Sequence, residues 1–98
     1  MALVISSGVA KNPRAYWGAY AISKAALENM AKIWAAENLK TNLKINIVNP
    51  GATRTKMRAL ALPGENPDTI PSAENVASKI ISCINNKNLK HGESIKIK

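Results

Sequence analysis

Two short apolar runs flank one long helix-forming segment, and this alternation constrains the fold more than any other feature. Ala2 to Ser7 is predicted to form a strand, about Gly18 to Leu39 a helix, and Leu43 to Asn49 a second strand, followed directly by Pro50-Gly51. Strands that alternate with helices indicate a parallel sheet, because each helix carries the chain back to the start of the next strand. We therefore expect an α/β fold.

The remainder of the chain continues the alternation. Because crossovers between parallel strands are normally right-handed, we expect three parallel strands with right-handed crossovers and flanking helices in three layers. The first strand would then have an open edge. The further predicted elements are a short helix or ordered loop at Thr53–Leu62, a breaker at Pro63–Pro67, a helix from Ser72 or Ala73 to about Asn85 with Ser72 as N-cap and Glu74 in its first turn, a turn at Asn86–Gly92 and a strand at Glu93–Lys98.

A phenol and an ammonium group lie four residues apart near the start of the long helix. Tyr20 and Lys24 occupy positions i and i+4, which face the same side of a helix. A nearby cation favours the ionised phenol, which can then give or take a proton near neutral pH. Ser7, thirteen residues before Tyr20, could hold a substrate carbonyl. Together the three side chains predict the proton-transfer part of a hydride-transfer site.

The lysine also has a simpler interpretation. Lys24, Glu28 and Lys32 form a ladder of alternating charge at four-residue spacing, which is typical of a solvated helix face. A tyrosine and a lysine at this spacing also occur together by chance. The spacing alone leaves catalysis and a solvated face both open, so the surrounding motifs have to decide between them.

Three motifs in a fixed order surround this pair, and two flanking segments extend them. The motifs are Ile5-Ser6-Ser7, Tyr20-Ala21-Ile22-Ser23-Lys24-Ala25-Ala26-Leu27 and Ile45-Asn46-Ile47-Val48-Asn49-Pro50-Gly51, and the flanking segments are Trp17-Gly18-Ala19-Tyr20 and Pro50-Gly51-Ala52-Thr53-Arg54-Thr55-Lys56-Met57-Arg58. In this order and spacing they resemble the C-terminal half of a short-chain dehydrogenase/reductase, over essentially residues 1–98. The flanking segments further resemble a bacterial subgroup of poorly characterised oxidoreductases.

The resemblance implies an NAD(P)-dependent oxidoreductase that transfers a hydride between the nicotinamide and a small carbonyl or alcohol substrate. Ser7 matches the serine that positions the carbonyl, and Tyr20 matches the acid/base. Lys24 matches the lysine that binds the nicotinamide ribose and favours the ionised tyrosine. Tyr20 and Lys24 are therefore expected to contact the cofactor as well as to act in catalysis.

The resemblance also assigns the residues after the second strand to cofactor binding. Beyond Pro50 and Gly51, it implies a backbone contact to the nicotinamide amide near Thr53 and a hydroxyl contact from Thr55 near the cofactor phosphates. The simpler interpretation of Pro50-Gly51 is a plain loop after a strand, and that of either threonine is a helix N-cap.

A glycine-rich turn is expected to lie outside these residues. In a Rossmann-type fold that turn and the helix after it receive the dinucleotide pyrophosphate, and none of the five glycines has the required spacing. We therefore expect a partial Rossmann-type doubly wound fold that binds NAD or NADP weakly or not at all by itself. Two functions stay open: the catalytic half of an oxidoreductase, completed by a separate N-terminal half, and a truncated, non-enzymatic remnant that only self-associates.

Composition narrows the class of protein. The 98 residues, 46% of them hydrophobic, suit one folded domain. No run approaches the roughly 18 to 20 apolar residues that span a bilayer, and we expect neither a secretion signal nor a membrane partner. The single cysteine, Cys83, is expected to be a buried small hydrophobe in the last helix, which fits the cytoplasm. No metal-ligand spacing occurs, and His91 has no second ligand near it in sequence.

The formal charge of +8 raises the possibility of nucleic-acid binding. The basic residues are scattered, however, and the four aromatic residues lie in the long helix or just before it rather than interleaved with them, so no specific nucleic-acid partner is expected. Arg54, Lys56 and Arg58 form the tightest basic cluster. Anion binding and a solvated helix face are both open for it.

The long helix is apolar over most of its circumference, which normally means burial on more than one side. In the resembled family the second partner is the same helix of another subunit, so a homodimer or homotetramer is expected. The apolar residues are Leu27, Met30, Ala31 and Trp34 in one stripe, and Ile22, Ala26 and Ile33 on another side.

Overall fold

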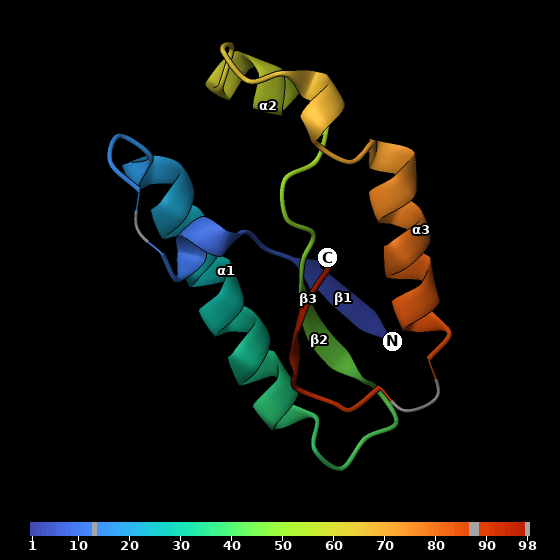
Figure 1. Cartoon of the computed structure of the whole chain (residues 1–98). Helices are drawn as coiled ribbons and strands as arrows, with labels where there is room; N and C mark the ends of the chain where they lie inside the picture. The colour runs from blue at the N-terminus through green and yellow to red at the C-terminus, as the bar shows by residue number, and fades with distance from the viewer. Residues whose placement is uncertain (13, 87–88, 98) are drawn as a thin grey trace.

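The structure is a computed structural model that describes residues 1–12, 14–86 and 89–97 (Figure 1). In chain order the elements are β1 (Ala2–Ile5), the 3-10 turn η1 (Gly8–Ala10), α1 (Gly18–Glu37), β2 (Ile45–Asn49), α2 (Lys56–Ala61), the 3-10 turn η2 (Pro67–Thr69), α3 (Ala73–Ile84) and β3 (Ser94–Lys96). The predicted elements are all present, and most are shorter than expected. The part of the predicted final strand at Lys98 lies outside the described residues, as do residues 87 and 88 of the predicted turn.

The three strands form one parallel sheet in the order β1-β2-β3. In the register Val4 lies beside Ile47, and Val48 lies beside Ile95. The central strand β2 is buried on both faces, and four of its five residues are buried. An apolar strand buried on both sides is what a parallel sheet between helical layers requires. The predicted α/β fold of three parallel strands with flanking helices is confirmed.

The two long helices cover opposite faces of this sheet (Figure 1). Both crossovers step in the same direction along the sheet, from β1 to β2 and from β2 to β3. Two steps in one direction with the same hand would place both helices on one face, so the two crossovers have opposite hands. The prediction that both crossovers are right-handed is therefore wrong.

The side of helix α1 that packs on the sheet differs from the one expected from the sequence, because it carries small residues and an acid rather than the large apolar residues. Glu28, Ala31 and Ala35 are 6%, 1% and 6% exposed, whereas Met30 and Trp34 are 50% and 38% exposed. The predicted solvated ladder is wrong at Glu28, which is buried. Small alanine side chains allow the helix axis to approach the sheet closely, so the larger apolar residues of α1 face outward.

Hydrogen bonds explain where the helices begin and end. At the end of α1 the Asn38 side chain donates to the carbonyl of Trp34 at 2.9 Å, and the helix stops two residues earlier than predicted. At the start of α3 the Ser72 hydroxyl accepts a hydrogen bond from the amide of Asn75 at 3.2 Å, with Glu74 in the first turn. The predicted N-cap is therefore confirmed.

His91 joins β2 to the end of α1. Its Nδ1 atom accepts from the amide of Ile45 at 3.1 Å, and its Nε2 atom lies 2.7 Å from the carbonyl oxygen of Ala35. Because Nδ1 accepts, the proton is on Nε2, which donates to Ala35. Both ring nitrogens are thus bonded to the backbone, and the role of His91 is structural.

Candidate active site

Tyr20 and Lys24 lie on adjacent turns at the start of α1, as their spacing predicts. The Lys24 Nζ atom is 5.7 Å from the centroid of the Tyr20 ring. The same ammonium group donates a hydrogen bond to the carbonyl oxygen of Ile5 at 3.2 Å. Lys24 therefore connects the phenol to the end of β1, and the three residues form one contact between helix and strand.

Ser7 is the second residue after β1. Its backbone is extended, with φ −149° and ψ 154°, and its carbonyl oxygen accepts from the amide of Ala10 at 3.1 Å to begin η1. The side chain is partly exposed. Since Lys24 bonds to Ile5, two residues before Ser7, the strand end that carries the serine is attached to the helix that carries the phenol.

Trp17 and Arg14 extend this group on the other side of the phenol, and the sequence analysis gave neither of them a role in the site. The Trp17 and Tyr20 rings meet edge to face with centroids 6.0 Å apart, and the Arg14 guanidinium carbon is 4.7 Å from the centroid of the Trp17 ring. Such contacts are individually weak but fix the ring planes. The repeated three-residue spacing of Arg14, Trp17 and Tyr20 is the signal that could have indicated them.

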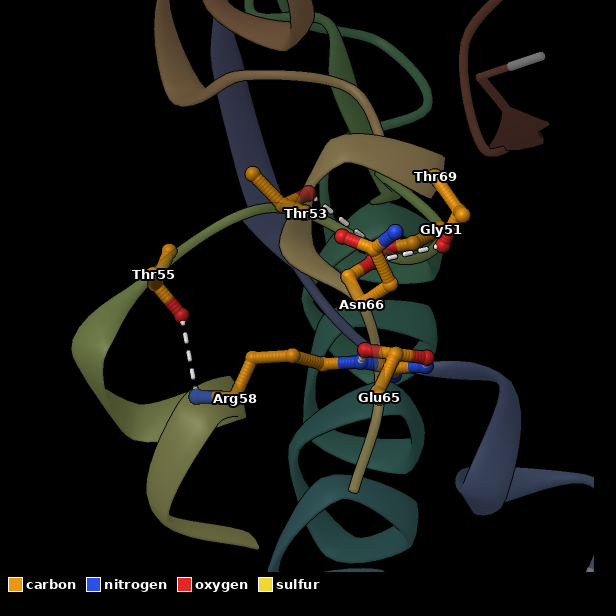
Figure 2. A network of polar contacts seen from close by, with 7 residues as sticks. All are labelled: Gly51, Thr53, Thr55, Arg58, Glu65, Asn66 and Thr69. Carbon is orange, nitrogen blue, oxygen red and sulfur yellow. Dashed lines mark hydrogen bonds and ion pairs between the residues drawn. The ribbon is translucent and has the colours of Figure 1, made fainter. Parts of the chain in front are cut away.

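The loop after β2 is held by its own polar groups (Figure 2). Asn49 Oδ1 accepts from the amide of Gly51 at 3.0 Å, and the Thr53 hydroxyl donates to the carbonyl oxygen of Gly51 at 3.3 Å. Gly51 has φ +74°, which side chains other than glycine rarely adopt. Pro50 and Gly51 thus form a defined turn at the carboxyl end of the sheet, where ligands bind in open α/β folds.

Thr55 is the N-cap of α2. Its hydroxyl oxygen accepts from the amide of Arg58 at 3.1 Å, as Figure 2 shows. The N-cap interpretation is therefore confirmed for Thr55, whereas the hydroxyl of Thr53 bonds within the preceding turn. A capping hydroxyl keeps its own proton, so Thr55 can still donate to a further acceptor.

The arginines of the basic cluster bind other parts of the chain. Arg58 forms a bidentate ion pair with Glu65, with distances of 2.9 and 2.8 Å (Figure 2). Its hydrogen bonds and charge hold the pKa of Glu65 below the usual value, and Glu65 in turn raises the pKa of Arg58. Arg54 Nε donates to the carbonyl oxygen of Pro67 at 2.9 Å. Arg58 is therefore half-buried and paired, whereas Arg54 stays exposed although it bonds to the chain. Together the two arginines attach η2 and the loop before it to α2 and the residues that lead into α2.

Two shallow pockets adjoin these elements. One, of about 260 Å³, lies between α2 and η2 and includes Arg54, Thr55 and Leu62 in its lining. The other, of about 250 Å³, lies at the carboxyl end of the sheet, where its lining includes Ser7, Glu28 and Asn49. The sequence did not predict that Glu28 would lie beside Ser7. Its helical spacing from Lys24 and Ala31 is the signal that places it on the face toward the sheet.

Two negative findings apply to the described residues. No three histidine, cysteine or acidic side chains gather there closely enough to hold a metal ion. No helix in that part of the chain is both long and apolar enough to cross a membrane. Cys83 is half-buried in α3.

Known proteins resemble this chain over about two thirds of its length. The short chain dehydrogenase family model matches residues 1–66. The "uncharacterized oxidoreductase YciK" of Escherichia coli K12 is 45% identical over 71 residues, which cover 72% of this chain and 28% of YciK. A vibriobactin-specific 2,3-dihydro-2,3-dihydroxybenzoate dehydrogenase of Vibrio cholerae is 41% identical over 56 residues, which cover 57% of this chain and 21% of that enzyme.

Solved structures match more of the chain. A short chain dehydrogenase of Shigella flexneri 2a in complex with NADP superposes with a TM-score of 0.83 at 36% identity, covering 96% of this chain and 39% of that one. One of Escherichia coli CFT073 in complex with NADPH superposes with a TM-score of 0.80 at 36% identity and the same coverage. The chain therefore spans well under half the length of the proteins it matches.

Proposed function

Because this chain belongs to the short-chain dehydrogenase family, we propose that it carries the catalytic side chains of an NAD(P)-dependent oxidoreductase. The observation that carries the proposal is the position of Lys24, which lies over the Tyr20 ring and bonds to the strand end that leads into Ser7. A phenol, a cation and a hydroxyl on adjoining elements are the groups that proton transfer at a carbonyl requires.

Each side chain has a distinct part in this reaction. The Ser7 hydroxyl donates a hydrogen bond to the substrate oxygen. The Tyr20 hydroxyl gives that oxygen a proton in reduction and takes it back in oxidation, and the Lys24 ammonium lies beside the Tyr20 ring. A bound nicotinamide supplies the hydride in reduction and accepts it in oxidation. The substrate is a small carbonyl compound or the corresponding alcohol.

The donors available in this structure suit a nicotinamide dinucleotide. Lys24 has three N–H donors and uses one on Ile5, so two remain for the hydroxyls of a ribose. Thr55 keeps a proton for a phosphate oxygen while it caps α2. Pro50, Gly51 and Thr53 form the turn that would contact the nicotinamide amide. The relatives crystallised with NADP and NADPH favour that form of the cofactor.

The activity requires a glycine-rich dinucleotide-binding segment in addition to these residues, because a pyrophosphate site needs backbone donors at a tight glycine turn. A second candidate function is self-association without chemistry. It is favoured by the outward face of α1, where Ile22, Met30 and Ile33 are 71%, 50% and 53% exposed. A homodimer or homotetramer through this face is compatible with either function.

Complementation distinguishes the two functions. Residues 1–98 are expressed with the segment of YciK that precedes its matched region, and oxidation of NADPH is followed with a panel of aldehydes and ketones. We expect turnover that Tyr20→Phe abolishes. The matched control is Tyr16→Phe, because Tyr16 is fully exposed and should tolerate the change. Self-association of a complemented chain that never turns over would favour the second function, and turnover retained in Tyr20→Phe would refute the assigned acid/base.

A further inference from the structure

Glu28 is the one charged side chain that is buried among the described residues. Its carboxylate accepts a hydrogen bond from the hydroxyl of Ser6, which is also buried, at 3% exposure. Lys11 lies 4.0 Å from the other carboxylate oxygen, but the Lys11 side chain is 56% exposed. A buried carboxylate is unfavourable unless it is hydrogen-bonded, so the bond from Ser6 is the contact that stabilises it most.

Ser6 and Ile5 connect the end of β1 to consecutive turns of α1. Lys24 bonds to the carbonyl oxygen of Ile5, and Glu28, one turn later, bonds to the side chain of Ser6. Ser7 follows directly and lines the same pocket as Glu28. Ser7, the residue proposed to bind the substrate oxygen, therefore directly follows two residues, Ile5 and Ser6, that are both bonded to α1.

We propose that Glu28 is a positioning residue, which holds Ser7 in place relative to Tyr20 through its hydrogen bond to Ser6. The inference rests on the proposed function for its meaning in catalysis. Packing alone does not require an acid here, because the next buried positions of the same face, Ala31 and Ala35, are small and apolar. A carboxylate at this position instead gives a directional bond to one strand residue.

Four variants of the 98-residue chain test the proposal. Ser6→Ala and Glu28→Leu each remove one partner of the bond. The double variant removes both and leaves no unpaired buried group, so its stability should recover toward that of the wild type. Glu28→Gln keeps an acceptor oxygen for Ser6 and loses the charge. Chemical denaturation gives the stability, and backbone amide relaxation in NMR gives the order of Ser7.

Stability and the order of Ser7 are expected to respond differently in the double variant. The order parameter of Ser7 should fall from about 0.85 to below about 0.6 in both single variants and in the double variant, while that of Val4 stays high. In Glu28→Gln it should stay near the wild-type value. Order at Ser7 that returns together with stability in the double variant, or that never falls, would overturn the proposal. Ser6→Ala is mild enough to remain folded if Glu28→Leu does not.

Relaxation does not need turnover, so this result can be read even if the proposed reaction fails. In the complemented enzyme the double variant should also lose about tenfold or more in kcat, since small misplacements of catalytic groups are costly. Glu28→Gln should retain kcat. A double variant that keeps the full kcat although its Ser7 is mobile would show that the Glu28–Ser6 bond does not support catalysis.

Discussion

The Nδ1 atom of His91 accepts a hydrogen bond from the amide of Ile45, 3.1 Å away. Ile45 is the first residue of β2 and His91 lies just before β3, so the ring joins two neighbouring strands at the start of the sheet. The other ring nitrogen bonds to α1 through Ala35. One side chain thus fixes α1 against the sheet.

This arrangement predicts that His91→Ala destabilises the chain by about 1 to 3 kcal/mol, because a partly buried amide and carbonyl lose their partner. Urea denaturation followed by circular dichroism measures the change. Lys40→Ala, at an exposed position, should change stability little. Equal stability of the histidine variant and the wild type would contradict the structural role of the ring.

The Arg58–Glu65 pair predicts a pH dependence. Because the pKa of Glu65 is held below its usual value in the folded chain, the pair contributes stability above the ordinary glutamate range of about 4.3 and loses it as the pH falls through the lowered pKa. Thermal unfolding between pH 7 and pH 3 should therefore show a smaller loss of stability on acidification in Glu65→Gln. Glu37→Gln at the end of α1 is the matched control.

Lys24 should matter for chemistry far more than a lysine elsewhere on the same helix. Lys24→Ala removes both the cation beside Tyr20 and the bond to Ile5, so kcat/KM of the complemented enzyme should fall by about 100-fold or more. Lys32→Ala, at an exposed position two turns later, should leave kcat/KM near the wild-type value. Similar losses in the two variants would show that charge on α1, rather than the position of Lys24, supports the reaction.

Dinucleotide binding by residues 1–98 alone should be weak. Under the proposed function, Lys24 and the Gly51 turn would contact the nicotinamide end and Thr55 a phosphate oxygen. A tight pyrophosphate site needs in addition a glycine-rich turn, which these residues do not contain. Titration calorimetry with NADPH and NADH should give no dissociation constant in the low micromolar range. Tight binding by the bare chain would show that another part of it receives the phosphates.

Self-association should depend on the outward side of α1. Met30 and Trp34 are large and substantially exposed, and complete burial of such side chains contributes roughly 1.5 to 3 kcal/mol each. Replacing both with glutamine should shift sedimentation velocity from dimer or tetramer toward monomer. The matched control, Met57→Gln, changes an exposed methionine on α2. A wild-type chain that is monomeric at tens of micromolar would exclude the interface.

The sequence predicted most elements and their order because strand, helix and cap signals are local. Ser72 as an N-cap and the Pro50-Gly51 turn depend only on neighbouring residues, and both were anticipated. The hand of the second crossover could not be anticipated. It depends on which face of the sheet α3 covers, and the apolar pattern of a helix does not contain that information.

In the candidate site, too, contacts between near neighbours in the sequence were predictable and contacts between distant residues were not. Tyr20 and Lys24 could be placed together because helix geometry fixes their separation. The burial of Glu28 could not be anticipated from charge spacing, because its partner, Ser6, is 22 residues away in the chain. The acceptors of Arg54 and Arg58 likewise could not be anticipated, since they lie in and around η2 and become neighbours of the arginines only on folding.

The edge-to-face contact of Trp17 with Tyr20 gives the protein an internal spectroscopic reporter. The chain has two tryptophans, and the separation of Trp17 and Trp34 by seventeen positions corresponds to about 25 Å along a helix axis. In a Trp34→Phe background the remaining indole emits from the rim of the candidate site. Ligand arrival, ionisation of the adjacent phenol or loosening of Arg14 would then be visible as changes in fluorescence, without any added label.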